Sequence, residues 1–271
     1  MAMKHAVDPK SYTTGTVTSK DGMVALPQKP VIVLVHGAFQ DSTGWADVIR
    51  VLEAKGYIAI AVQQVGRSGD KTPIKDITLE TYRDAVVNVI KKQDQPVILV
   101  GHSFGGMVIS AVAEAVPDRI KALVYLAAYL PRNGESLRAI SSQDKYSILG
   151  KEGNFIVAKD YSTASIAQEV FASGLCPDGS ADQLKVVAAS QIDEPLAPLN
   201  AKVTLTDKNF GSVRKTYILT AQDVMVSPQL QALMLVNTPV DKVCAVNAGH
   251  AAYITAPDAL AAIIDNVASQ K

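Results

Sequence analysis

A serine flanked by glycines is the first group in this sequence that could do chemistry. Residues 101–106 read GHSFGG, which places Ser103 in the pattern G-x-S-x-G. The apolar run VILV ends just before this pattern, and an apolar stretch with helical character, 107–116, begins directly after it. A strand, a tight turn and a helix in that order form a nucleophile elbow, which exposes the serine hydroxyl at the edge of a sheet. The sequence therefore predicts Ser103 as a nucleophile, with a plain glycine-rich turn as the alternative.

A serine hydroxyl needs a base within hydrogen-bond reach, and the chain has four histidines. His250 follows the apolar run 241–247 in a short loop. The carboxyl ends of strands in an open parallel sheet collect site residues, so this position suits a base. His5 lies in the polar N-terminal segment, His36 ends a strand where we expect it to bond backbone, and His102 adjoins the serine and should point away from it. We predict His250 as the general base.

The histidine in turn needs a carboxylate to orient it. Asp223 follows the apolar run 214–220 and gives the chain order Ser, Asp, His, which is typical of this kind of elbow. Three other aspartates compete less well. Asp207 lies in an irregular region, Asp241 begins a strand, and Asp258 lies in the first turn of a helix, where a carboxylate suits the helix dipole. We predict Asp223 as the third member.

Attack by the serine creates an oxyanion, which two backbone N–H groups would stabilise. We expect one from Phe104, the residue after the nucleophile. The other should come from the loop after the first core strand, where Ala38 is the first choice and Phe39 the second. Such chemistry requires no metal and no cofactor, and we expect none.

The elements that must position these groups alternate between strands and helices. Apolar runs predict strands at 31–37, 57–63, 120–128, 214–220 and 241–247, and a strand followed by a turn at 96–106. Helical spacing of apolar residues predicts helices at 45–56, 79–93, 107–116, 227–237 and 256–270. This alternation predicts an α/β protein with a mostly parallel central sheet and helices on both faces.

The 271 residues suit one domain with an insertion. Prolines, glycines and short mixed segments dominate about 130–210, where no strong strand is predicted, so we interpret this region as a cap inserted over the sheet. We divide the chain into an N-terminal extension, 1–29, and a domain, 30–271, that carries the cap at about 130–210. Within the extension, residues 1 to about 15 are polar, and Asp21-Gly22 between β-prone runs predicts a hairpin.

Composition excludes several kinds of partner. The 26 basic and 26 acidic side chains balance without a basic stripe, so nucleic acid and anionic membranes are poor candidates. No apolar run approaches the roughly 20 residues of a membrane span, and the first residues lack the apolar region of a signal peptide. We expect a cytoplasmic protein or the mature part of an exported, periplasmic one. The two cysteines, Cys176 and Cys244, lack metal-ligand spacing and are expected to be free thiols, with a single disulfide as the alternative.

Three motifs together carry a resemblance to a known family. They are HGAFQDSTGW (36–45), GHSFGG (101–106) and TAQD with NAGH between 220 and 250. The chain resembles the plant methylesterase and hydroxynitrile lyase branch of the α/β hydrolases and its bacterial esterase-like relatives, over about residues 30–270. The resemblance implies the α/β-hydrolase fold. The branch's triad and oxyanion positions fall on the residues predicted above.

The branch contains two chemistries, and two positions help to choose between them. Its lyases resemble esterases in which a threonine replaces the glycine of the HG motif and a lysine follows the catalytic histidine. Gly37 and Ala251 stand at those places here, which favours ester hydrolysis. The resemblance thus favours a serine hydrolase of carboxylic esters that forms an acyl-enzyme. Few charges occur in the segments expected to line the pocket, which predicts a small or medium, mainly apolar ester.

Substrate contacts and alternatives stay open at this level. Candidate lining residues, each as consistent with a core position, are Phe39, Trp45, Phe155, Tyr161, Phe171 and Met225. The same triad could serve a C–C or C–N bond hydrolase or a hydroxynitrile lyase, and the fold could serve a non-catalytic protein that binds a small ligand. The partner expected in each case is a small molecule. The oligomeric state is open, a homodimer included.

Overall fold

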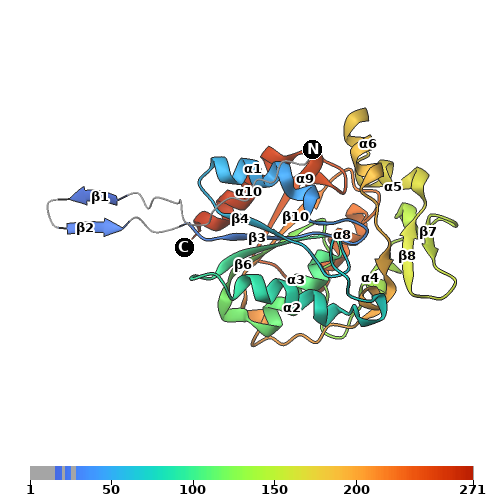
Figure 1. Ribbon diagram of the computed structural model, residues 1–271, viewed down its shortest axis with the longest axis horizontal. Helices are drawn as coiled ribbons and strands as arrows, with labels where there is room; N and C mark the ends of the chain where they lie inside the picture. The colour runs from blue at the N-terminus through green and yellow to red at the C-terminus, as the bar shows by residue number, and fades with distance from the viewer. Residues whose placement is uncertain (1–15, 20–21, 26–28, 271) are drawn as a thin grey trace.

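A computed structural model describes residues 16–19, 22–25 and 29–270, and its centre is a six-stranded sheet (Figure 1). The strands lie in the order β11-β10-β6-β5-β3-β4, and every neighbouring pair is parallel. Their bounds are β3 Ile32–Val35, β4 Ala59–Val62, β5 Val97–His102, β6 Ile120–Leu126, β10 Lys215–Thr220 and β11 Lys242–Val246. Strands β3 and β5 are buried along their whole length, as runs of apolar β-branched residues favour. The predicted parallel sheet is confirmed.

Helices cover both faces of this sheet. Figure 1 shows α1 (Ala46–Ala54) and α10 (Pro257–Ser269) on one face and α2 (Leu79–Ile90) and α3 (Gly105–Ala115) on the other. Helix α2 begins at a capping box, because the Thr78 and Thr81 side chains each accept the other's backbone N–H. Helix α8 (Pro228–Asn237) begins with a proline and packs beside β10. Each of these helices lies where apolar spacing predicted one.

Residues 130–210, here named the cap insert, lie between β6 and β10 and differ from the prediction. No strong strand was expected, yet β7, β8 and β9 form a three-stranded antiparallel sheet. The insert contains α4 Leu137–Ser141, β7 Phe155–Val157, β8 Thr163–Ile166, α5 Gln168–Leu175, α6 Ala181–Ala189, β9 Glu194–Pro195 and α7 Leu196–Asn200. The longest of its strands has four residues, too few to show a clear alternation of apolar side chains.

The segment before the sheet contains the predicted hairpin. Strands β1 (Thr16–Ser19) and β2 (Gly22–Ala25) pair antiparallel, with Ser19 opposite Gly22. The turn residues 20–21 and the polar residues 1–15 lie outside the described part of the chain. None of the described helices is long and apolar enough to cross a membrane.

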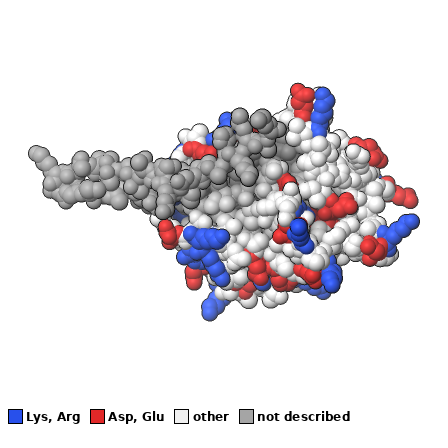
Figure 2. All heavy atoms as spheres, in the orientation of Figure 1, with Lys and Arg blue, Asp and Glu red and all other residues white. Residues whose placement is uncertain are grey.

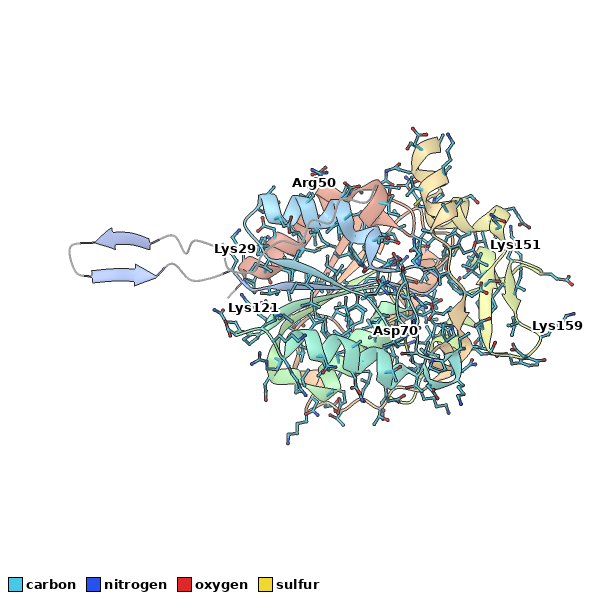
Figure 3. The ribbon with its side chains drawn as sticks, viewed as in Figure 1. Lys29, Arg50, Asp70, Lys121, Lys151 and Lys159 are labelled. Carbon is cyan, nitrogen blue, oxygen red and sulfur yellow. The ribbon has the colours of Figure 1, made fainter. Side chains whose placement is uncertain are left out.

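Charged side chains are spread over the surface in both signs. Figure 2 shows acidic and basic groups interspersed on the visible face. In Figure 3, Lys151 and Lys159 lie at the end that carries β7 and β8, and Lys29 and Lys121 lie at the opposite end. The even spread agrees with the balanced composition.

Gly106, in the first turn of α3, lies against the loop that follows β6. A Cβ atom on Gly106 would lie 2.1 Å from the backbone oxygen of Tyr129. This oxygen belongs to the main chain and cannot rotate away. The same loop is tied to the neighbouring turn, since the Tyr129 amide donates to the Ser103 oxygen at 3.0 Å. The close approach of α3 to the sheet therefore depends on the missing side chain.

Replacing Gly106 by alanine is expected to lower the free energy of unfolding by about 3 kcal/mol, at the upper end for overpacking, because the obstructing atom is backbone. Urea unfolding of the two proteins measures the change. Gly150→Ala is the matched control, since a Cβ there meets nothing within 4 Å. It should stay within about 0.5 kcal/mol of the parent. Equal stability of the two variants would contradict the packing argument.

His36 links the loops after β3 and β4 from a buried position. Its Nδ1 donates to the Gly37 oxygen at 2.8 Å, and its Nε2 accepts from the Gln64 amide at 3.4 Å. Burial, assisted by the positive charge of Arg67, lowers the pKa of His36 to about 4. The ring is therefore neutral in the folded protein at pH values where it is protonated in the unfolded chain.

This difference makes folding stability depend on pH. Between the unfolded pKa of 6.5 and the folded value of about 4, the unfolded chain binds more protons at His36, so stability falls as the pH falls through this window. Acidification from about pH 7.5 to about pH 5 should cost about 2 kcal/mol at His36. Urea unfolding at both pH values tests this, and His36→Gln should lose about 2 kcal/mol less than the parent. An equal loss in both proteins would show that His36 does not carry the effect.

Candidate active site

Ser103 lies in the turn between β5 and α3, as predicted for an elbow. Its φ is +53°, a left-handed conformation that residues other than glycine rarely adopt. Three backbone hydrogen bonds hold it there: the Ser103 amide donates to the Leu126 oxygen at 3.2 Å, and the Ser103 oxygen accepts from the Gly106 and Tyr129 amides at 3.0 Å. Such a conformation persists because the surrounding structure over-determines it, and it brings the side chain out of the strand direction.

His250 and Asp223 come together after β11 and β10, as their positions after strands predicted. The Nδ1 of His250 lies 2.7 Å from Oδ2 of Asp223, and both side chains are buried. Because a carboxylate only accepts, Nδ1 carries the proton in this bond, and Nε2 of a neutral ring is left with a free lone pair. The pair can therefore act as a base held in one orientation.

The Asp223 carboxylate is itself fixed by four other donors. Oδ1 accepts from the Met225 amide at 2.8 Å and the Val226 amide at 2.9 Å. Oδ2 accepts from the hydroxyl of Thr220 at 2.9 Å and the amide group of Gln231 at 3.3 Å. The Gln231 side chain is fully buried and also donates to the Val226 oxygen at 2.7 Å. The sequence did not single out Thr220 or Gln231, because no motif marks their contact with the acid.

The loop of His250 is held between the elbow and the cap insert. The Nε2 of His102 donates to the His250 oxygen at 3.0 Å, and the two rings lie 4.5 Å apart. On the other side, the Ala251 amide donates to the oxygen of Leu175, the last residue of α5, at 2.8 Å. The histidine next to the serine is thus a support for the base loop, a role that the sequence did not reveal.

The loop after β3 contains the expected oxyanion donors. Phe39 has φ +65°, and its N–H donates to Oε2 of Glu194 in the cap insert at 2.9 Å. Its carbonyl accepts from the Ile192 amide at 2.9 Å. Within the part of the chain that the structure describes, the amides of Ala38 and Phe104 donate to no other group. Of the three amides expected as donors, Phe39's is therefore already engaged and the other two are available.

A buried ion pair that the sequence did not reveal lies under this loop. Arg67 and Glu194 are 127 positions apart, and their side chains are almost wholly buried and bonded to each other. The Tyr82 hydroxyl donates to Oε1 of Glu194 at 2.9 Å, and Nε of Arg67 donates to the Gln40 oxygen at 3.0 Å. Burial raises the pKa of Glu194, while the Arg67 charge opposes that rise.

The six side chains expected to line a pocket lie in different surroundings. Phe39 and Phe155 meet edge to face with ring centroids 6.2 Å apart, which brings β7 of the cap insert to the loop after β3. Phe155 is partly exposed and Tyr161 is 76% exposed. The other three, Trp45, Phe171 and Met225, are buried. Trp45 packs on Tyr253 at 4.8 Å, a contact typical of a core residue.

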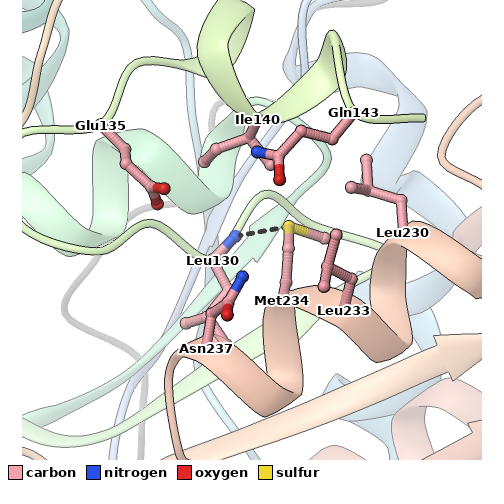
Figure 4. A pocket seen from close by; sticks show the side chains of 8 residues that line it. All are labelled: Leu130, Glu135, Ile140, Gln143, Leu230, Leu233, Met234 and Asn237. Atoms are coloured by element: carbon pink, nitrogen blue, oxygen red, sulfur yellow. Dashed lines mark hydrogen bonds between the residues drawn. The ribbon is translucent and has the colours of Figure 1, made fainter.

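Two cavities lie away from these residues. The one in Figure 4 has about 10 Å³, room for about one water molecule, and lies between the start of the cap insert and α8, where the Leu130 amide donates to Sδ of Met234. The other, of about 220 Å³, lies between α2, α3 and residues 202–204. Neither is lined by Ser103 or by the His250–Asp223 pair. The described residues contain no group of three potential metal ligands, and both cysteines are free thiols.

Comparison with known proteins gives relatives over most of the chain. Residues 32–263 match the model of the Alpha/beta hydrolase family. Putative methylesterase 11, chloroplastic, of Arabidopsis thaliana is 30% identical over 246 residues, which cover 87% of this chain and 63% of that protein. The chain thus spans less than two thirds of the length of this relative. Esterase PIR7B of Oryza sativa subsp. japonica is 24% identical over 91% of this chain and 98% of its own.

Solved structures agree on the fold. Polyneuridine aldehyde esterase superposes with a TM-score of 0.78 at 21% identity, covering 89% of this chain and 100% of that one. Its likeness concerns the backbone arrangement, which is the parallel sheet with helices on both faces described above. The elbow between β5 and α3 is the feature that this architecture places at the carboxyl edge of the sheet. Because the family model matches residues 32–263, most of the chain's length, the chain belongs to the alpha/beta hydrolase family.

Proposed function

We propose that the chain is a carboxylic-ester hydrolase in which Ser103, His250 and Asp223 form a catalytic triad. The observation that carries the proposal is the 2.7 Å bond between His250 and Asp223. The loop of His250 is bonded in turn to the nucleophile turn, because Nε2 of His102 donates to the His250 oxygen. An oriented base with a free Nε2 and a serine on a left-handed turn are the groups that nucleophilic catalysis requires. Relatives named methylesterase and esterase support the same reaction.

The proposed reaction has two halves. Oγ of Ser103 attacks the ester carbonyl while its proton passes to Nε2 of His250, and Asp223 stabilises the imidazolium. The amides of Ala38 and Phe104 bind the oxyanion of the tetrahedral intermediate. The intermediate collapses to an acyl-enzyme as His250 returns the proton to the departing alcohol. Water, activated by the same histidine, then attacks the acyl-enzyme and releases the acid.

The surroundings of Gly37 and Ala251 support hydrolysis over cyanohydrin cleavage. A Cβ on Gly37 would lie 2.8 Å from Cβ of Ser103 and 3.0 Å from Nδ1 of His102, so a threonine at this place would displace the nucleophile. Ala251 is fully buried, and its amide is bonded to Leu175. The residue directly after His250 is an uncharged alanine, and the lyase pattern of threonine and lysine is absent at both positions.

The domain division and substrate class belong to the same proposal. We infer that residues 30–271 form the hydrolase domain and that the cap insert covers the site, because Glu194 and Phe155 both reach Phe39. Aromatic faces at this contact suit a small or medium ester that is mainly apolar. The acyl-enzyme route requires no metal or cofactor.

Ser103→Ala is expected to lower kcat by about a thousandfold or more, because the nucleophile is lost while the oxyanion donors and the binding site stay. Hydrolysis of p-nitrophenyl esters from acetate to laurate by both proteins measures this, and the chain-length profile reports the size of the pocket. A cyanide-release assay run in parallel tests the lyase alternative. Activity that persists in the alanine variant, or a parent inactive on every ester, would contradict the esterase proposal.

Asp223→Asn is expected to lower kcat by about ten-thousandfold, the magnitude seen for the equivalent change in serine proteases. An amide can donate to Nδ1, which favours the ring tautomer that has its proton on Nε2 and so blocks the base. The measurement is kcat on the best ester of the series, with thermal unfolding as the check that the variant is folded. A loss of less than about tenfold would mean that another carboxylate orients the base.

A further inference from the structure

We propose that Glu194, through the Phe39 amide, is a positioning residue that sets the geometry of the oxyanion loop, residues 37–41. This inference rests on the proposed ester hydrolysis. It gives a residue of the cap insert an indirect role in stabilising the oxyanion, through the loop after β3. The observation behind it is the 2.9 Å hydrogen bond from the Phe39 N–H to Oε2 of Glu194.

The backbone of Phe39 needs such a restraint. A φ of +65° is unusual for an aromatic residue, and the loop keeps it only if other groups hold both of its neighbouring peptide units. The cap insert binds the Phe39 N–H through Glu194 and the Phe39 carbonyl through the Ile192 amide. The chain on each side of Phe39 is therefore fixed by one short segment, residues 192–194.

Glu194 is itself held rigidly. Its side chain is fully buried, bonded to Arg67 through Oε2 and to the Tyr82 hydroxyl through Oε1. Arg67 also donates to the Gln40 oxygen, so the ion pair is hydrogen-bonded to the loop at two successive residues, Phe39 and Gln40. A buried ion pair is a poor source of stability, since the cost of removing both charges from water offsets their attraction. Its contacts with Phe39 and Gln40 point to placement of the loop as its role.

Small movements of this loop would reach the reacting atoms. A Cβ on Gly37 would come within 2.8 Å of the Ser103 side chain, so Gly37 lies directly beside the nucleophile and Ala38 follows it in the chain. Oxyanion donors act only when they lie about 2.7–3.1 Å from the developing charge. A displacement of about 1 Å can lower a rate about a hundredfold. Because the oxyanion forms after substrate binds, loss of the restraint should lower kcat and leave KM unchanged.

Two double variants separate the effect of the hydrogen-bond acceptor at position 194 from the effect of the Glu194 charge. Both carry Arg67→Met, which removes the cation, combined with either Glu194→Gln or Glu194→Leu. The glutamine oxygen can still accept the Phe39 N–H, whereas leucine cannot, and neither variant buries an unpaired charge. Both variants lose the Arg67 bond to Gln40, so the comparison is between them: we expect kcat of Arg67→Met with Glu194→Leu to be about tenfold to a hundredfold below that of Arg67→Met with Glu194→Gln, at constant KM.

Two further readouts separate positioning from general damage. Affinity for a boronic acid that mimics the tetrahedral intermediate should fall in parallel with kcat in the leucine variant alone. Hydrogen exchange of the segment 37–41 should speed up in that variant and not in the glutamine variant. Glu114→Gln is the matched control, because Glu114 similarly binds the backbone amides of Thr206 and Phe210 but away from the site. It should change neither kcat nor exchange of residues 37–41.

The outcomes distinguish this inference from the proposed function. If the parent hydrolyses esters through Ser103 and both double variants lose the same activity, the acceptor has no positioning role and the inference is wrong. A loss expressed mainly in KM would equally overturn it. If the parent hydrolyses no ester, the proposed function is wrong, and the exchange data decide alone: unchanged exchange of residues 37–41 in the leucine variant overturns the anchoring by Glu194.

Discussion

The left-handed turn at Ser103 is the constraint on which the rest of the site depends. A serine in this conformation is tolerated only where strand, helix and neighbouring loops leave it no alternative. The buried strand β5 delivers the residue, the missing side chain of Gly106 lets α3 approach, and the backbone of Leu126 and Tyr129 bonds both sides of the turn. The position of every other group is defined relative to this turn.

The cap insert, proposed above to cover the site, also forms hydrogen bonds with the loops around it. It bonds the loops that carry Ala38, Asp223 and His250, and so these loops are not free to move independently. The three bonds run from Phe39 N to Glu194 Oε2, from Ala251 N to Leu175 O and from Ser147 Oγ to Met225 O. Loops at the carboxyl edge of a sheet are usually the most variable part of this architecture. In the proposed reaction, these bonds would hold the oxyanion donors and the base in place before charge develops.

Most buried polar groups around the site have a specific partner, and among the described residues Nδ1 of His102 and Nη1 of Arg67 are exceptions. Asp223 has five donors, Glu194 has three, and His102 and His36 each bond backbone. Satisfied partners make buried polar groups tolerable, since an unpaired one would cost the full desolvation energy. The same burial keeps His36 uncharged in the folded state, which makes the arrangement sensitive to acid.

The sequence by itself determined the α/β architecture and the order in which strands and helices follow one another along the chain. It also pointed to Ser103, Asp223 and His250, which stand after strands in the chain, because strand ends, glycines and helix starts leave local patterns. Only the tertiary structure decided what supports them. The strands of the cap insert are too short to show periodicity, and the contacts of Glu194 with Arg67 and Phe39 join residues 127 and 155 positions apart. Such contacts leave no local pattern, since they depend on where the folded chain brings distant segments together.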